Sequence, residues 1–233
     1  MARVLLVVGA MTAARAEPVR VLTFVEVRSD ATEHAGALLR QYARALREGA
    51  TPPEVDVLQE IGRPERFVLL VRAEDETALS TRVQRAQAIL QSLDPLLTAP
   101  LDRRANHLFV PPCAAARGSR VAHAEARGEA ARSLARRLYT VAHLDLAGPV
   151  QPGPQAALQQ LAARACESAG NMWFEVGQQI NRGNHFNLVA HWESRRDVEA
   201  FAGSAPAREF RARVGPWLGS PYDERLYRTL GGD

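Results

Sequence analysis

The side chains best suited to chemistry lie in the last third of the chain, along a strand predicted at residues 184–193. His185, Asn187 and His191 alternate with a second set that ends in Trp192, so the two sets should point to opposite faces of a sheet. A histidine titrates near neutral pH and can act as a general base. An amide in mid-strand, such as Asn187, is unusual and could hydrogen-bond a carbonyl or a phenolate. Each of these residues could equally be an ordinary structural side chain.

Aromatic residues around this strand could form a flat binding slot. The predicted catalytic residues are His185 and Trp192, and the predicted substrate contacts are Trp173, Phe174, Asn187, His191, Phe210 and Trp217. Any one of the aromatic residues could instead belong to an ordinary core. His185 and His191 lie roughly 20 Å apart along a strand, too far to share an ion, so no metal site is predicted. His143, on a predicted neighbouring strand, could approach His185.

The elements that must position these residues occur twice. Residues 57–71 match residues 176–190 without a gap, and the same offset aligns two predicted helix faces. Both faces have the i, i+3, i+4, i+7 spacing of an amphipathic helix. They consist of Leu39, Tyr42, Ala43 and Leu46 in the first copy and Leu158, Leu161, Ala162 and Ala165 in the second. The sequence therefore indicates two copies of one small domain.

Each copy is predicted to run strand, helix, strand, tight turn, strand, helix, strand. The first copy has strands at 20–28, 53–61, 65–73 and 104–110 and helices at 31–48 and 75–93. The second has strands at 137–146, 172–180, 184–193 and 223–230 and helices at 154–169 and 195–214. Pro206 should break or restart the last helix.

This order is the ferredoxin-like βαββαβ unit, whose sheet carries helices on one face only. We therefore predict an α+β fold in which two tandem ferredoxin-like domains pack sheet to sheet as an intrachain α+β barrel. The first domain covers residues 17–111 and the second covers residues 135–233, with a linker at 112–134.

The N-terminus bears on cellular location. Residues 1–16 combine Arg3, an apolar run and Ala14-Arg15-Ala16, which is typical of a signal peptide with a small-x-small cleavage site. Its removal would take two arginines from a net charge of +3 and give a periplasmic or secreted protein. If residues 1–16 stay in place, for example as an edge strand, the protein would be cytoplasmic. In an oxidising compartment Cys113 and Cys166 could pair, which the sequence leaves open.

Charge and hydropathy narrow the choice of partners. Acidic and basic residues are interleaved, as in Arg63-Pro64-Glu65-Arg66, whereas a nucleic-acid surface gathers basic residues on one face. No apolar stretch reaches the length of about 18 residues that a spanning helix needs. We expect neither a nucleic-acid partner nor a membrane span.

The second copy carries a recognisable pattern of residues. Its strand 186–194 ends in Trp192-Glu193-Ser194, and the helical segment beyond it carries Phe201, Ser204-Ala205-Pro206, Phe210 and Pro216-Trp217-Leu218. Over about residues 136–230 this pattern resembles the antibiotic biosynthesis monooxygenase (ABM) family of dimeric α+β barrels. The first copy resembles the family only through its likeness to the second copy, because it has Ala73 at the position that corresponds to Trp192. One site, in the second copy, is therefore expected.

The resemblance implies a cofactor-independent monooxygenase that acts on an aromatic or quinol-like small molecule. In such enzymes the deprotonated substrate itself passes an electron to dioxygen, so the partners would be a small aromatic molecule and dioxygen, with no cofactor. Haem degraders in the family use an Asn on the first strand and a His on the last helix. The corresponding segments here, 138–144 and 210–214, contain no Asn and no His respectively, so haem degradation is disfavoured. The alternative hypothesis is a non-catalytic exported barrel that binds a small apolar ligand. The chain would be a monomer with a pseudo-dimeric barrel, or a homodimer.

Overall fold

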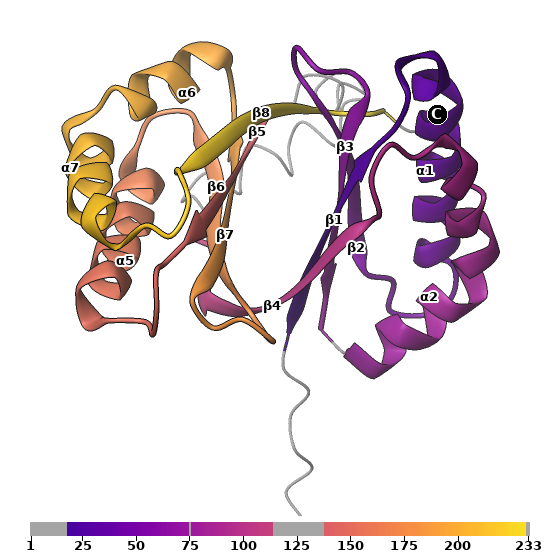
Figure 1. The fold of residues 1–233 in the computed structure, drawn as a ribbon, viewed down its shortest axis with the longest axis horizontal. Coiled ribbons are helices and arrows are strands. Elements are labelled where there is room, and N and C mark those ends of the chain that lie inside the picture. Colours follow the sequence, from indigo (N-terminus) through magenta and orange to yellow (C-terminus); the bar gives the residue numbers. More distant parts are fainter. Residues whose placement is uncertain (1–17, 75, 114–137, 232–233) are drawn as a thin grey trace, which may run out of the picture.

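The computed structural model describes residues 18–74, 76–113 and 138–231 (Figure 1). The predicted signal peptide and nearly all of the predicted linker lie outside these residues. Within them, no helix combines the length and the apolar character needed to cross a membrane.

Each half has the predicted order of strands and helices. The first half consists of β1 (Val19–Glu26), α1 (Thr32–Arg47), β2 (Glu54–Glu60), β3 (Arg66–Ala73), α2 (Glu76–Gln91) and β4 (Asp102–Val110). The second consists of β5 (Leu138–Asp145), α5 (Pro152–Glu167), β6 (Asn171–Gln179), β7 (His185–Trp192), α6 (Arg195–Ala202), α7 (Ala205–Val214) and β8 (Asp223–Thr229).

The last helical segment divides as predicted at Pro206. α6 ends before Gly203, and the side chain of Ser204 accepts a hydrogen bond from the backbone N–H of Ala207 at 3.4 Å, which caps the start of α7. Pro206 lies in the first turn of α7, where its missing N–H costs no helical hydrogen bond. The corresponding segment of the first half forms one helix, α2.

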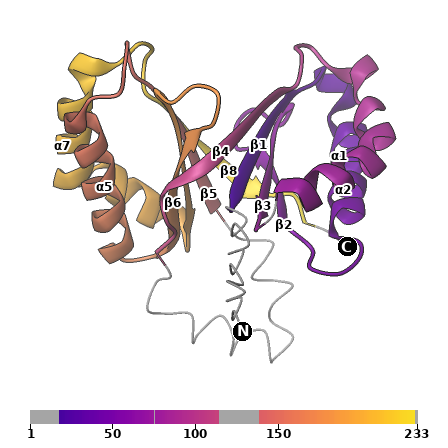
Figure 2. The same ribbon diagram turned by 90° about the horizontal axis from the view of Figure 1, so that it is seen from below.

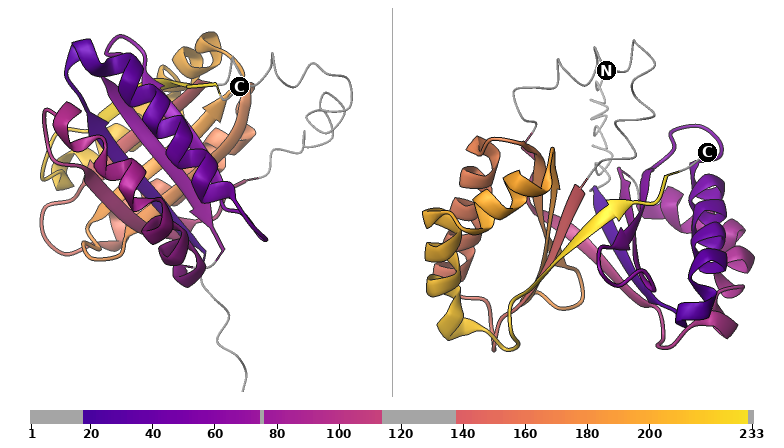
Figure 3. Two further views of the ribbon diagram at one scale, coloured as in Figure 1. Left: turned by 90° about the vertical axis from the view of Figure 1, so that its right-hand side faces the viewer. Right: turned by 90° about the horizontal axis from the view of Figure 1, so that it is seen from above.

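The eight strands form one closed barrel in the order β1-β3-β2-β8-β5-β7-β6-β4. The helices of each half cover the outer face of their own sheet, and the two bare faces look at each other across the barrel (Figures 1 and 3). The predicted α+β barrel within one chain is therefore confirmed, and its closure comes from the joined edges of the two sheets. β4 pairs with β6, and β8 crosses to pair with β2 (Figure 2). Edge strands carry unpaired N–H and C=O groups, and closure satisfies them.

In the described part of the chain, three apolar cores follow from the alternation of side chains along the strands. One lies between α1, α2 and the first sheet, and includes the predicted helix face. A second lies between α5, α6, α7 and the second sheet, and includes the other. The third fills the middle of the barrel with Leu22, Leu58, Val68, Leu70, Tyr139, Val141, Val189 and Tyr227. The first and second cores hold each half together, and the third joins the halves.

Polar contacts inside the barrel also join the halves. The Arg20 side chain on β1 donates to the Glu175 carboxylate on β6 at 3.1 Å, and both side chains are buried. The Tyr139 hydroxyl of β5 donates to Asp56 of β2 at 3.3 Å. Such buried polar groups cost free energy unless they are paired, so they fix how one half sits on the other.

Cys113 and Cys166 form a disulfide, which decides the pairing that the sequence left open. Cys113 lies just after β4, and Cys166 lies in the last turn of α5. The bond therefore ties the end of a first-half strand to a helix of the second half. A disulfide is expected in proteins that fold in an oxidising compartment.

Loss of the disulfide should destabilise the protein without changing its fold. The bond closes a loop with a sequence separation of 53 residues, so replacing both cysteines by serine is expected to lower the free energy of unfolding by about 2–4 kcal/mol. Urea denaturation of the wild type and the double variant, each with and without reductant, measures this. Reductant should bring the wild type to the level of the variant and leave the variant unchanged. Equal midpoints for the oxidised wild type and the variant would contradict the prediction.

Candidate functional site

A small cavity lies between the second sheet and the helices that cover it. Its floor and walls come from Thr140, Ala142, Phe174, Leu188, Ala190, Trp192, Tyr222 and Glu224, and its roof from Leu161, Phe201, Ala202, Ala207, Phe210 and Arg211. The cavity volume of about 20 Å³ is room for one water molecule. Aromatic and aliphatic side chains therefore close the site tightly around a small empty space.

Trp192 is the central side chain of this floor. It is 2 % exposed, and its indole N–H donates to the Thr140 hydroxyl at 3.1 Å. Its ring packs against Phe201 of α6 with the ring centres 5.1 Å apart. The hydrogen bond to β5 and the ring contact to α6 fix the orientation of the indole.

The charged groups of the cavity and the Tyr222 hydroxyl lie on its α7 and β8 side. The Tyr222 hydroxyl donates to the Glu224 carboxylate at 2.8 Å, and burial, together with that carboxylate, raises the pKa of Tyr222 well above its ordinary value. The phenol is therefore a hydrogen-bond donor at neutral pH. Arg211 also lines the cavity, and its guanidinium donates to the backbone carbonyl of Ala202 at 2.9 Å.

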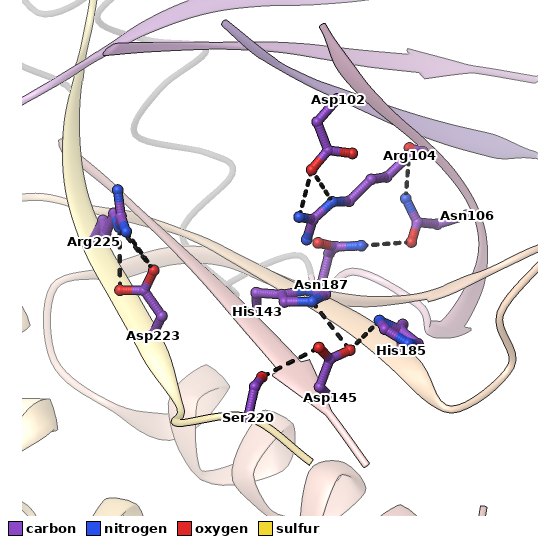
Figure 4. Close-up of polar contacts among 10 residues, drawn as sticks. All are labelled: Asp102, Arg104, Asn106, His143, Asp145, His185, Asn187, Ser220, Asp223 and Arg225. Carbon is purple, nitrogen blue, oxygen red and sulfur yellow. Dashed lines mark hydrogen bonds and ion pairs between the residues drawn. The ribbon is translucent and has the colours of Figure 1, made fainter. Parts of the chain in front are cut away.

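A second group of polar side chains lies on the other face of the same sheet, inside the barrel (Figure 4). The Asn187 amide of β7 donates to the Asn106 carbonyl oxygen of β4 at 2.8 Å. The two meet across β6 at Gly177, where a Cβ would lie 2.8 Å from the Cβ of Asn106. Only glycine leaves room for this contact. Arg104, two residues before Asn106, makes two hydrogen bonds to Asp102, at 2.9 and 2.6 Å.

Two histidines and an aspartate continue this polar group toward β5. Asp145 lies directly opposite His185, and its Oδ1 contacts His185 Nδ1 and lies 3.2 Å from His143 Nε2. The centres of the two imidazole rings are 5.5 Å apart, as the pairing of the first and third strands of the half predicts. Burial, followed by the nearby Arg104 for His143, lowers the pKa of both histidines.

The comparison with known families concerns the part of the chain that builds the cavity. Residues 149–213 match the family model described as antibiotic biosynthesis monooxygenase (ABM). We call the second half of the chain, which contains this match, the ABM domain. No curated protein matches the chain significantly in sequence.

The fold around the ABM domain is shared with solved structures along almost the whole chain. A candidate monooxygenase from Fusobacterium nucleatum superposes with a TM-score of 0.72 at 8 % identity, covering 93 % of this chain and 94 % of the other. A candidate monooxygenase from Lactobacillus acidophilus gives 0.66 at 8 % identity, with 92 % and 97 % covered. An anthrone oxidase-like protein gives 0.63 at 11 % identity, with 93 % and 94 % covered. At these identities the likeness shows the fold alone.

The sheet of the ABM domain divides the predicted site residues into two groups. Trp192, Phe174 and Phe210 meet in the helix–sheet cavity. His185, Asn187, His191 and Trp173 lie on the opposite, barrel-facing side, because side chains alternate along β6 and β7. The expected base and the expected slot are therefore on different faces.

Three of the predicted substrate contacts have other surroundings. Trp217 is 41 % exposed and does not line the cavity, because the short helical turn that carries it points to solvent. The guanidinium carbon of Arg72 lies over the Trp173 ring, 5.0 Å from the ring centre. His191 stacks on Tyr139 with the ring centres 4.9 Å apart.

Sequence reasoning missed one acidic residue on the barrel face of the ABM domain and three polar residues at the cavity. Asp145 follows His143 by two residues, a spacing that places two side chains on one face of a strand and could have indicated the pair. Arg211, Tyr222 and Glu224 had no comparable signal, since they reach the cavity from helix α7, a loop and strand β8, which only the fold brings together.

Proposed function

We propose that the ABM domain is a cofactor-independent monooxygenase that binds an aromatic or quinol-like molecule in the helix–sheet cavity. The observation that carries the proposal is that residues 149–213, which match the family, build most of the aromatic floor and the helical roof of this cavity. Trp192, Phe174 and Phe210 present ring surfaces on which a flat aromatic molecule packs well.

For an anthrone-type substrate, the proposed reaction oxidises an activated CH₂ group beside the aromatic rings. The substrate loses a proton, and its anion passes one electron to dioxygen. The resulting radicals combine, which forms a C–O bond in a peroxide. Loss of the second C–H proton and cleavage of the O–O bond then yield a ketone and water. Dioxygen is the oxidant, and both of its oxygen atoms are accounted for in the products.

The charged groups at the cavity supply the proton transfer and the anion binding that this reaction needs. Glu224 receives the substrate proton, and the hydrogen bond from Tyr222 holds its carboxylate in place. Arg211 stabilises the anion that forms, because a guanidinium favours negative charge on a nearby oxygen. His185 is not required in this scheme, since it lies on the other face of the sheet.

Binding requires the cavity to widen, because its volume of about 20 Å³ is too small for an aromatic ring. In the proposal α6 moves outward. It has one buried residue, Val198, whereas α7 is held by Ala207, Phe210 and Val214. Gly203, between the two helices, provides the joint.

Oxygen uptake with a panel of anthrones and quinols tests the proposal. Arg211→Met and Glu224→Gln are each expected to lower kcat/KM by about tenfold, less than is typical of buried groups because both side chains are exposed. Arg213→Met and Glu209→Gln, on α7 but outside the cavity lining, are the matched controls and should behave as the wild type. Uptake by the wild type no faster than the uncatalysed reaction would refute the proposal, as would equal rates for all four variants.

We further propose that the first half is a degenerate copy, related to the second by duplication. Its elements repeat in the same order, but α2 is unbroken and Ala73 occupies the position of Trp192. Its sheet–helix interface is packed by aliphatic side chains. One working site per chain follows, and because the barrel closes within the chain, the protein is proposed to act as a monomer.

A second candidate function is an exported barrel that binds a small apolar ligand without chemistry. The disulfide between Cys113 and Cys166 supports export to an oxidising compartment, as does the predicted signal peptide. The mostly apolar lining of the cavity supports ligand binding. Native mass spectrometry of protein from the periplasm or the medium distinguishes the candidates: a co-purified ligand without oxygen uptake favours this one.

A further inference from the structure

The side chains of His143, Asp145 and His185 meet at one end of the barrel interior. His143 and Asp145 lie two residues apart on β5 and share its barrel face, and His185 lies opposite Asp145 on β7. Each offers one ligand atom, and the three atoms lie within 4.8 Å of one another. Two adjacent, hydrogen-bonded strands hold them, so the backbone fixes their spacing (Figure 4).

The contacts within this group are close but lack hydrogen-bond geometry. Asp145 Oδ1 lies 3.2 Å from His143 Nε2 and contacts His185 Nδ1. Among the described residues, neither Asp145 Oδ1 nor His185 Nδ1 has a hydrogen-bond partner of acceptable geometry, and both atoms are buried. When the imidazole nitrogen carries no proton, its lone pair and the carboxylate oxygen repel each other unless a cation binds both.

We propose that His143, Asp145 and His185 bind a divalent transition-metal ion in the barrel interior. Two imidazoles and one carboxylate are the donor set that suits zinc, iron, cobalt or nickel rather than magnesium or calcium. The side chains of His143 and Asp145 are 21 % and 23 % exposed, so water can occupy further coordination positions. The site is separate from the helix–sheet cavity and does not depend on the proposed oxygenase reaction.

Neighbouring groups orient the ligands. The Ser220 hydroxyl donates to Asp145 Oδ2 at 3.2 Å, which leaves Oδ1 for the ion. Asn187 lies directly opposite His143 on β7 and is itself held by Asn106. Polar partners of this kind, one layer outside the ligands, raise metal affinity by about 10–100-fold.

The charges around the site set a limit on its affinity. Arg104 and Arg182 lie near enough to act on the two histidines, and positive charge opposes a cation. The two hydrogen bonds from Arg104 to Asp102 offset much of its charge. The nearby positive charge is therefore expected to weaken the binding of a cation.

Two titrations of untagged, metal-free protein test the proposal. Calorimetry measures the binding of Zn²⁺, and visible absorption measures the binding of Co²⁺. The wild type should bind one ion per chain, and Co²⁺ should show the absorption of nitrogen and oxygen ligands at low coordination number. Asp145→Asn, which keeps the side-chain shape, and His143→Ala should each weaken binding by at least about tenfold. Ser220→Ala tests the same site without removing a ligand and should weaken binding by a smaller factor.

His191→Ala is the matched control, because His191 lies on the same strand and the same face as His185 but at the other end of the barrel. It should bind as the wild type does. Circular dichroism verifies that every variant is folded. No saturable binding to the wild type would overturn the proposal, and so would equal binding by the Asp145→Asn and wild-type proteins. Neither result bears on oxygen uptake, so the two proposals fail separately.

Discussion

Trp192→Ala is expected to abolish oxygen uptake and to lower the free energy of unfolding by about 3–5 kcal/mol, the range for removing a buried tryptophan from a core. The indole is 2 % exposed and contacts both Thr140 and Phe201, so its loss removes the floor of the cavity and leaves a void. Urea denaturation gives the stability, and uptake assays at a temperature where the variant is folded give the activity.

Trp192→Phe separates the two effects. It keeps an aromatic ring in the cavity and removes the N–H that donates a hydrogen bond to the Thr140 hydroxyl. The loss of this bond should lower the free energy of unfolding by about 1 kcal/mol. The variant should stay folded and retain activity within about tenfold of the wild type. Trp217→Ala is the control for tryptophan loss as such, because Trp217 is 41 % exposed, and a change within about 0.5 kcal/mol is expected. Full activity in folded Trp192→Ala would place the substrate elsewhere.

Glu175→Ala is expected to destabilise the protein by about 3–5 kcal/mol at pH 8, the usual cost of leaving one partner of a buried ion pair alone. The Glu175 side chain accepts a hydrogen bond from Arg20 at 3.1 Å, and this contact joins β6 to β1 across the two halves. Replacing both Arg20 and Glu175 by methionine should restore most of the loss, since no buried charge remains. A double variant no more stable than Glu175→Ala would contradict this account.

The Glu175 carboxyl should also make stability depend on pH. Burial raises the pKa of Glu175 above its ordinary value of 4.5, although Arg20 opposes the rise. The folded protein therefore keeps this proton to a higher pH than the unfolded chain does, and stability falls as the pH rises from 4.5 to the raised pKa. Glu175→Gln should remove this part of the slope, as measured by urea denaturation at a series of pH values. An unchanged slope would assign the dependence to other groups.

Much of the framework could be predicted because it depends on local patterns. The helix face that includes Leu158 and Leu161 is buried as its spacing predicts, and Pro206 lies where α7 starts. Alternation along β7 correctly separates His185 from Trp192. These features follow from periods of 3.6 and 2 residues and from the missing N–H of proline, which are properties of the chain itself.

The candidate site was less predictable because its residues come from distant segments. Trp192, Phe174 and Phe210 meet in the cavity, but the groups beside them that can carry charge, Arg211 and Glu224, had no sequence signal. Trp217 lies one residue after a proline in the pattern that resembles the family, yet it faces solvent. The sequence identifies Trp217 as an aromatic residue, but its exposure depends on the direction that the chain takes directly after α7.

By itself the sequence determined the order of the elements, the two buried helix faces, the split of the last helix and the separation of His185 from Trp192 on opposite faces of the sheet. Only the tertiary structure decided that the strand edges pair, β4 with β6 and β8 with β2, and that this brings Asn106 to Asn187 over Gly177. It also placed Asp145 between His143 and His185. The physical reason is that side-chain direction is set by each strand's own period, whereas the partners of an edge are chosen by long-range hydrogen bonding that no local pattern encodes.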